Sequence, residues 1–503
     1  MFNKGASSGL LSTRGSQVLA LSLLLLTVCI LLEYRYNYFF LNDDNRTYAL
    51  PAFMHNWEAL SEGAVPLYNF HQFLGTPHLA LSQPASLYPP GYLASLLSQL
   101  AFGHGYAVID ILVVAHLLLG GVGFYILTRH MGLGGSGAFF GGLTWPLASF
   151  SIYGSDSWWC ISAVVAYLPW MVVFAMRLYD GMGGPAFAPL VLARSLLFYS
   201  GYAQYFVYAC IFEFLTVSLL VAPSLLKPNR RPHLLRFLEL YIASYVVLLF
   251  VSLPLLLPTW HQMDISEDRN QPLPYNAFLR RIFPTNVWLP GLLFQSVNAY
   301  GTYNENLISY LVFIGYLTLL SILYSAWALT RNNDKRNPLH AHIVTYGILA
   351  VFSFTWSASK AFQSFLYLLP ILNRFRWPFK VYLFTDFYLV LLAAIGFHLL
   401  AVSLRNYRNA IPAALILIQA SSMSYVYLSS PHYTFIEHGC AGGRYCPAQL
   451  RYGEDLFSTD KLAGELVDGG YSPYLTLGGT CPPTSATTMR PSGGFTSSPA
   501  TTP

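Results

Sequence analysis

Charged residues are scarce in this chain. Of its 503 residues only 10% are Asp, Glu, Lys or Arg, whereas hydrophobic residues make up 54% and the mean hydropathy is +0.46. A soluble domain usually carries about 25% charged residues. So few charges cannot cover a water-facing surface, which excludes an ordinary soluble enzyme. The apolar content also excludes intrinsic disorder for the body of the chain.

Several common chemical signatures are missing as well. The six cysteines show no Cys-x-x-Cys or Cys/His spacing of a metal site. The sequence contains no Gly-rich phosphate loop, no Gly-x-Ser-x-Gly and no Ser-x-x-Lys arrangement. The glycine-rich run 132–137 is typical of a tight turn with small-residue packing between membrane helices. The net charge of +5 does not indicate nucleic-acid binding, because in a membrane protein the position of basic residues matters more than their sum.

Long apolar stretches dominate instead, and about eleven of them reach membrane-spanning length or nearly so. We place them near 16–33, 106–128, 134–152, 158–178, 186–200, 202–222, 234–258, 306–329, 339–357, 378–402 and 410–428. The first lacks a small-residue cleavage site and is interpreted as a retained anchor. The fifth is the least secure, because it is short and contains Arg194. The prediction is an all-α polytopic membrane protein.

Basic residues predict the orientation of these spans. With the N-terminus in the cytoplasm, the inside segments hold Lys4, Arg14, Arg129, Arg177, the run 227–231, the run 331–336, Arg405 and Arg408. This is the positive-inside pattern, and eleven spans then put the C-terminus outside. The outer loops lie at about 33–105, 259–305 and 358–377. A transmembrane domain of residues 1–429 is therefore followed by an extracytoplasmic tail, 430–503, whose Ser, Thr, Pro and Gly content predicts disorder towards its end.

Two adjacent carboxylates, Asp43 and Asp44, follow the first span directly. They are either a solvated helix end or a functional pair at the membrane surface, as a general base or as ligands of a divalent cation. The scarcity of acids, only 22 in the chain, favours the functional reading. The rest of this loop is dense in Pro, Gly and aromatic residues, which indicates a fixed loop of short helices and turns.

A series of short motifs follows the acidic pair in a specific order. In the first outer loop these are Pro51, Gly63-x-x-Pro66-Leu67-Tyr68-Asn69, Gly75-x-Pro77-His78 and Tyr88-Pro89-Pro90. Later come Trp158-Trp159 with Leu168-Pro169-Trp170, then Ser200-Gly201-Tyr202-x-Gln204, then Arg374-x-Arg376-Trp377-Pro378-x-Lys380. Over residues 20–405 this order resembles that of YfhO-type bacterial membrane proteins, in the GT-C superfamily of polyprenyl-phosphate-dependent glycosyltransferases. Tyr202 stands where those proteins commonly have His.

The resemblance implies a GT-C-like helical bundle in the bacterial cytoplasmic (inner) membrane, with its active site on the outer face. It implies a polyprenyl-phosphate-linked sugar as donor and an extracytoplasmic glycan, lipid or polymer as acceptor. It also implies a catalytic acid in the first outer loop, which we carry to Asp44 with Asp43 second. The acceptor hydroxyl must lose a proton as it displaces the lipid phosphate, and a carboxylate can take it. One displacement inverts the anomeric configuration.

Basic residues on the outer side are exceptions to the positive-inside pattern and candidates to hold the leaving phosphate. These are Arg280, Arg281, Arg374, Arg376 and Lys380. Arg matches phosphate oxygens in a bidentate fork and Lys supplies a point charge. The alternative is snorkelling of these side chains to lipid headgroups.

Three further residues are weaker candidates for the site. Asp156 is either a second site acid or the N-cap of the following helix. Glu305 is either a site acid or an acid favoured by the macrodipole at a helix start. His78 is the loop histidine best placed to touch substrate. Whether Asp43, Asp44 and Asp156 hold Mg²⁺ or Mn²⁺ stays open. In the tail we expect Cys440 and Cys446 to pair, leaving Cys481 unpaired.

Two other classes of protein compete with the enzyme. A transporter or flippase of lipid-linked saccharides would need internal repeats and broken mid-membrane helices. No repeat is visible, and the polar clusters lie in the outer loops, which favours an enzyme. A non-catalytic membrane subunit would not need acids and outer basic residues together. The sequence leaves the sugar and the acceptor open.

Overall fold

The computed structural model describes residues 9–72, 75–225, 229, 231–266, 270–285, 288–293, 311–331, 338–404 and 410–429. Throughout this part the secondary structure is helical, apart from a single bridge between Asn69 and Thr76. The α-helices are α1 (Gly9–Arg35), α2 (Leu50–Ser61), α3 (Pro89–Phe102), α4 (Val108–His130), α5 (Gly135–Leu147), α6 (Ser149–Ser157), α7 (Cys160–Tyr179), α8 (Gly184–Tyr199), α9 (Ala203–Val221), α10 (Arg231–Ile265), α11 (Tyr275–Phe278), α12 (Trp288–Leu293), α13 (Tyr316–Arg331), α14 (Pro338–Ala358), α15 (Lys360–Leu366), α16 (Tyr382–Ser403) and α17 (Ala410–Ser429). Short 3₁₀ or π turns cover Asn45–Ala49, Leu79–Leu81, Ala222–Ser224, Leu372–Arg374 and Pro378–Val381.

The described helices make this chain an all-α polytopic membrane protein. Eight of them are long and apolar enough to cross a bilayer, at Arg14–Arg35, Val108–His130, Cys160–Tyr179, Ala203–Ser224, Pro232–Ile265, Leu339–Ala358, Pro378–Ser403 and Ala410–Ser429. The three other expected spans are shorter helices: α5 followed by α6, α8, and α13. The expected count of eleven is therefore not confirmed.

The stretch expected as one span at 134–152 is broken in two. α5 ends at Leu147 and α6 begins at Ser149, because Ala148 between them has an extended backbone with ψ 143°. Pro146 lies in the last turn of α5, where it has no N–H to donate to the carbonyl oxygen four residues earlier. The free N–H of Ser149 is satisfied by the carbonyl oxygen of Phe313 at 2.8 Å.

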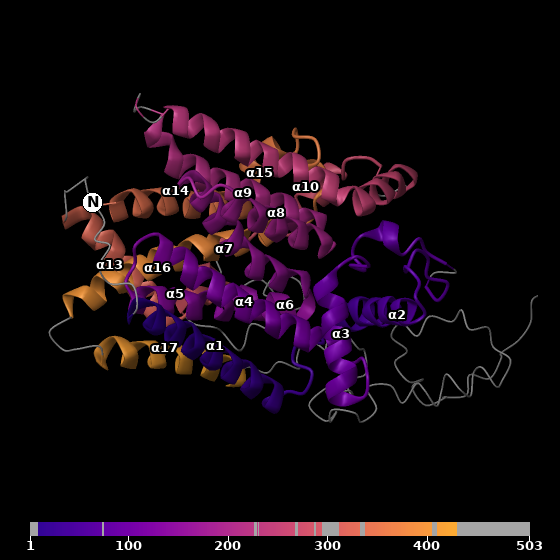
Figure 1. The fold of residues 1–503 in the computed structure, drawn as a ribbon, viewed down its shortest axis with the longest axis horizontal. Helices are drawn as coiled ribbons and strands as arrows, with labels where there is room; N and C mark the ends of the chain where they lie inside the picture. The colour runs from indigo at the N-terminus through magenta and orange to yellow at the C-terminus, as the bar shows by residue number, and fades with distance from the viewer. Residues whose placement is uncertain are drawn as a thin grey trace, which may run out of the picture.

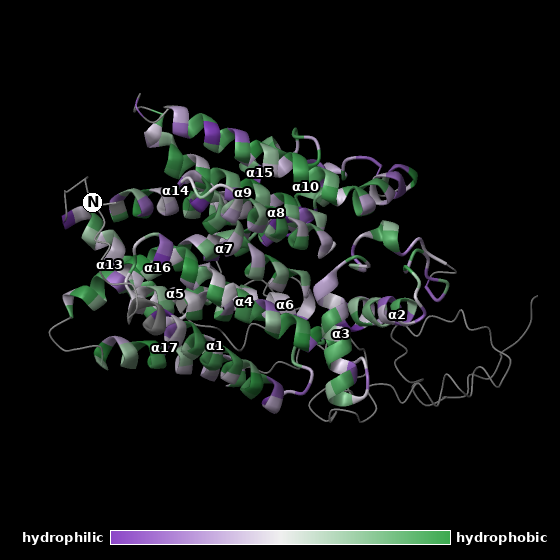
Figure 2. Cartoon of the chain, viewed as in Figure 1, coloured by the Kyte–Doolittle hydropathy of each residue, from purple (hydrophilic) through white to green (hydrophobic). Residues whose placement is uncertain are grey.

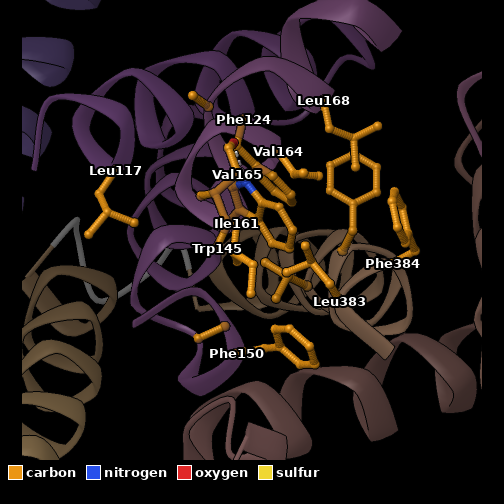
Figure 3. Close-up of a cluster of buried hydrophobic side chains, with 14 of the residues drawn as sticks. Leu117, Phe124, Trp145, Phe150, Ile161, Val164, Val165, Leu168, Leu383 and Phe384 are labelled. Atoms are coloured by element: carbon orange, nitrogen blue, oxygen red, sulfur yellow. Dashed lines mark hydrogen bonds between the residues drawn. The ribbon is translucent and has the colours of Figure 1, made fainter. Parts of the chain in front are cut away.

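The long helices lie side by side along one direction, and α2 and α3 sit together at one end of this bundle (Figure 1). α4 packs against α5 and α7, and α16 packs against α5, α13 and α14. Trp145 lies at the centre of the core, among side chains of α4, α7 and α16 (Figure 3), and its indole N–H donates to the carbonyl oxygen of Val165 at 2.9 Å. The expected small-residue packing is confirmed at Gly137, where a Cβ would lie 2.8 Å from the carbonyl oxygen of Ala394.

Apolar residues dominate the long helices (Figure 2). Many large apolar side chains on these helices are exposed, which suits a lipid environment. α3 also exposes such side chains at the end of the bundle. Its exposed leucines are Leu93 (57%), Leu96 (40%), Leu97 (44%) and Leu100 (75%). Their spacing of three and four residues places them on one face of the helix. α3 therefore has one face on α2 and α4 and an apolar face turned outwards.

The short helix α8 is secured by a buried ion pair. Arg194 donates to both carboxylate oxygens of Glu213 on α9, at 2.8 to 3.0 Å, and both side chains are 0% exposed. Tyr241 and Tyr245 of α10 donate to the same carboxylate, and Ser244 accepts from Arg194 at 2.6 Å. The arginine that made this span insecure from sequence thus has a complete set of partners on two neighbouring helices.

Candidate active site

The acidic pair lies in a turn that is tied to the junction of α6 and α7. Asn45, next to Asp44, is buried, and its amide nitrogen donates to the carbonyl oxygens of Phe40 (2.8 Å), Ser155 (2.7 Å) and Asp156 (2.8 Å). Its amide oxygen accepts the backbone N–H of Trp159 at 2.7 Å. Three of these four hydrogen bonds therefore fix the first outer loop to the junction of α6 and α7.

Asp43 has an unusual backbone conformation and a raised side-chain pKa. Its φ of +43° lies in the left-handed region, which Asp tolerates better than most residues. The side chain is exposed, yet the surrounding protein and the neighbouring charge of Asp44 raise its pKa to about 6, against a smaller lowering by Arg281. A carboxyl group with a pKa near 6 changes its protonation state close to neutral pH.

Asp44 faces Trp158, which directly follows α6. The indole Nε1–H of Trp158 donates to Oδ2 of Asp44 at 2.8 Å. Both residues line a small, open pocket, and its volume of about 360 Å³ includes open solvent. The lining includes Asp44, Tyr48, Gln83, Trp158, Ser200 and Tyr202. Four separate segments of the chain converge there, so the acid lies beside a space that can hold part of a ligand.

Behind this pocket Lys380 is held in an aromatic cage, which we define as the rings of Trp158, Tyr202, Tyr205 and Trp377. Their centroids lie 5.2, 4.6, 5.9 and 4.7 Å from the Lys380 Nζ. Nζ also donates a hydrogen bond to the hydroxyl of Tyr202. Lys380 is only 2% exposed. Cation–π contacts and the phenol oxygen thus replace the water that the ammonium would otherwise bind.

The segment between α8 and α9 brings Tyr202 to the pocket. Gly201 has φ +84°, and a Cβ there would lie 2.2 Å from the carbonyl oxygen of Ser82, so only glycine fits this approach. The Ser82 hydroxyl donates to the carbonyl oxygen of Gly201 at 2.7 Å. Gln204 donates to the carbonyl oxygen of Arg376 at 2.7 Å. The motifs Ser200–Gln204 and Arg374–Lys380, far apart in sequence, therefore meet at this site.

The outer arginines are distributed unevenly around the site. The guanidinium of Arg281 lies 4.3 Å from the ring centroid of Trp377, and its charge acts on Asp43. Arg280 and Arg376 are exposed and Arg374 is half-buried. None of the four lines the pocket described above. Of these four arginines, Arg281 is the one whose charge acts on the acidic pair.

Two of the other candidates occupy structural positions. His78 is 0% exposed, contacts Asn56 through Nε2 at 2.9 Å, and has its pKa lowered to about 4 by burial and by His55. It does not line the pocket. Asp156 lies in the last turn of α6 and does not cap α7, which begins at Cys160 without a side-chain cap, so the N-cap interpretation is wrong.

Asp156 instead supports the turn of the acidic pair. Its carbonyl oxygen accepts the backbone N–H of Asn42 and the side chain of Asn45, and its carboxylate accepts the hydroxyl of Ser157 at 2.8 Å. Burial raises the pKa of the Asp156 carboxyl well above its usual range. It is therefore placed to hold the loop rather than to face the pocket.

The remaining expectations concern metal binding and the end of the chain. Among the described residues, no group of three or more His, Cys, Asp or Glu is arranged to hold a metal ion. Glu305, Cys440, Cys446, Cys481 and the tail 430–503 lie outside the described residues.

Sequence reasoning did not foresee the contacts that organise this site. Trp158 and Tyr202 could be singled out from the sequence because they belong to motifs. Nothing in the sequence marked Asn45 except its position after the acidic pair. Comparison with models of known protein families gives no match, and no curated protein matches the chain.

Proposed function

We propose that this protein is an integral-membrane glycosyltransferase that moves a sugar from a polyprenyl-phosphate donor to an extracytoplasmic acceptor. The observation that carries the proposal is the pocket in which Asp44, Trp158 and Tyr202 meet in front of Lys380. An inverting transfer needs a base for the acceptor proton and positive charge near the departing phosphate. A carboxylate at the N–H edge of the Trp158 indole and a buried ammonium near the same ring supply both.

The roles follow from the contacts. Asp44 takes the proton from the acceptor hydroxyl, and the Trp158 N–H holds its carboxylate in one orientation. Arg281, Arg280 and Arg376 are exposed and attract the anionic donor. The aromatic rings around the pocket suit a sugar face. Asp43 tunes the charge beside the base, because its own carboxyl titrates near pH 6.

One observation supports the alternative function, a flippase of lipid-linked saccharides. Its class uses broken membrane helices, and α5 and α6 are such a break. Against it, the backbone at this break is buried and bonded to Phe313, and no residue of α5 or α6 lines the pocket. The enzyme is therefore the better supported function.

One reconstitution experiment tests the proposal. Purified protein in vesicles is supplied with radiolabelled undecaprenyl-phosphate glucose and with envelope glycan from the source cells. We expect label on the glycan and release of undecaprenyl phosphate. Movement of the labelled lipid across the bilayer, with no glycan ever labelled, would show a flippase instead. A donor panel of other undecaprenyl-phosphate sugars extends the same assay to the sugar identity.

A further inference from the structure

Lys380 was expected to contact the donor phosphate directly, but its position does not suit that role. The side chain is 2% exposed and does not line the pocket. The aromatic cage surrounds Nζ on several sides. Tyr202 is different, because it lines the pocket and its hydroxyl accepts a hydrogen bond from Nζ.

A phenol that accepts a hydrogen bond from an ammonium becomes a stronger donor through its own O–H. The ammonium withdraws electron density from the phenol oxygen, and such chains of hydrogen bonds polarise one another. A hydroxyl has one proton to donate as well as lone pairs to accept. The buried charge of Lys380 thereby polarises the Tyr202 hydroxyl, and Tyr202 lines the pocket.

The backbone around Tyr202 is built to hold this geometry. Gly201 is locked against Ser82, Gln204 is bonded to the carbonyl oxygen of Arg376, and the ring of Tyr202 lies 5.3 Å from that of Tyr205. Asp44 lines the same pocket. Base and polarised phenol therefore flank one space.

We propose that Tyr202 is a catalytic residue whose hydroxyl donates to the leaving phosphate, and that Lys380 is a positioning residue that acts through it. This inference rests on the proposed function. In the step, the acceptor oxygen forms a bond to the anomeric carbon as the bond from that carbon to the phosphate oxygen breaks. The electron pair of the broken bond stays on the phosphate, which leaves as a dianion, and the acceptor proton passes to Asp44 and then to solvent.

The Tyr202 hydrogen bond strengthens as negative charge develops on the phosphate, so it acts mainly on the transition state. Tyr202→Phe keeps the ring and removes only the hydroxyl. We expect kcat to fall about 10²-fold, as for loss of one donor to a developing oxyanion, with the donor KM changed less than about threefold. Tyr199→Phe is the matched control, because it removes a phenol hydroxyl bonded only to the carbonyl oxygen of Val251, outside the pocket.

A double-mutant cycle separates action through Tyr202 from direct contact. Lys380→Met should lower kcat in the wild-type background but change it less than about threefold in the Tyr202→Phe background, because the route of its charge is already cut. Tyr202→His, which restores an N–H donor, should recover part of kcat. Thermal midpoints of all variants identify any that fail to fold. For an unfolded Lys380→Met, Lys380→Gln takes its place in the cycle.

Two results would overturn the inference while leaving the proposed function intact. One is normal kcat for Tyr202→Phe beside an inactive Asp44→Asn. The other is an equal fold loss for Lys380→Met in both backgrounds, which would mean that Lys380 acts without Tyr202. Failure of the wild-type protein to transfer any sugar, by contrast, would defeat the proposed function itself.

Discussion

The indole nitrogen of Trp158 lies 2.8 Å from a carboxylate oxygen of Asp44, although the two residues are 114 positions apart in the chain. The same indole also contacts Lys380, whose Nζ lies 5.2 Å from the ring centroid. Trp158 thus contacts both the acid and the buried cation. This arrangement orients the acid without neutralising it, because the lysine contacts the ring and not the carboxylate.

The first prediction concerns the Trp158 N–H. Trp158→Phe keeps an aromatic ring near Lys380 but removes the donor to Asp44. A hydrogen bond to a charged group contributes about 1.5–3 kcal/mol, so the transfer rate should fall by roughly one to two powers of ten. Asp44→Asn should cost more. The check is kcat in the reconstituted transfer assay, with Trp170→Phe as control, since Trp170 lies in α7 and donates to the carbonyl oxygen of Leu119. Equal activity of wild type and Trp158→Phe would contradict the orienting role.

The second prediction concerns Asp43 and pH. Its pKa is raised from the usual 3.8 to about 6 in the folded protein, so between those values the folded state binds more protons than the unfolded state. The free energy of unfolding contributed by Asp43 therefore falls as pH rises from about 4 to about 6. Asp43→Asn lacks this dependence and tolerates the left-handed backbone.

The measurement is the thermal midpoint of both proteins in detergent from pH 4 to pH 7.5. As pH rises to about 6, the thermal midpoint of Asp43→Asn should increase relative to that of the wild type. Above pH 6 the difference between the two midpoints should stay constant. Because the side chain is exposed, the effect should be small. A constant difference over the whole range would show that Asp43 does not titrate in this window.

The third prediction concerns the buried pair of Arg194 and Glu213. Glu213→Leu leaves a guanidinium that cannot lose its proton, whereas Arg194→Leu leaves a carboxylate that can take one up. Breaking a buried pair costs about 3–5 kcal/mol, so both single variants should be destabilised, and Glu213→Leu more. The double variant Arg194→Leu/Glu213→Leu should be more stable than either. Thermal unfolding in detergent checks the order, with Ser244→Ala as a milder control, and a double variant worse than both singles would contradict it.

The fourth prediction concerns the leucine face of α3. We expect this face to lie against the lipid surface at the end of the bundle. A spin label at Leu97→Cys, in a background with the native cysteines replaced by serine, should collide more with oxygen than with a water-soluble nickel complex. The label at Gly63→Cys, in the turn after α2, should show the reverse. Preferential nickel collisions at residue 97 would mean that water covers this face.

Sequence alone predicted the helical class and most spans, because an apolar run of twenty residues has few alternatives to a membrane helix. It did not predict the break at Ala148, since a proline in an apolar run is compatible with a continuous membrane helix. It also made α8 the least secure span, because this helix contains Arg194 and the sequence does not show that Glu213 of α9 is its partner. Such pairings depend on which helices become neighbours, and apolar composition does not specify neighbours.

Some residues that meet at the candidate site were singled out from the sequence. The scarcity of acids singled out the pair Asp43 and Asp44, and the structure brings that pair together with the motifs around Trp158 and Lys380. The burial of Lys380 was not predictable, because charge on the outer side suggests exposure. The same holds for His78, whose motif suggested a surface role and whose side chain is in the interior.

The most direct test of the account is the behaviour of Asp44→Asn with a bound donor. This change keeps the shape of the side chain and a hydrogen-bonding oxygen but removes the proton acceptor. Sugar transfer should fall by about 10²–10⁴, while the dissociation constant for undecaprenyl-phosphate glucose stays within about threefold of wild type. Glu58→Gln, an exposed acid of α2 outside the pocket, should transfer normally. If Asp43→Asn alone were inactive, the base would be its neighbour. Normal transfer by both Asp44→Asn and Asp43→Asn would contradict the account.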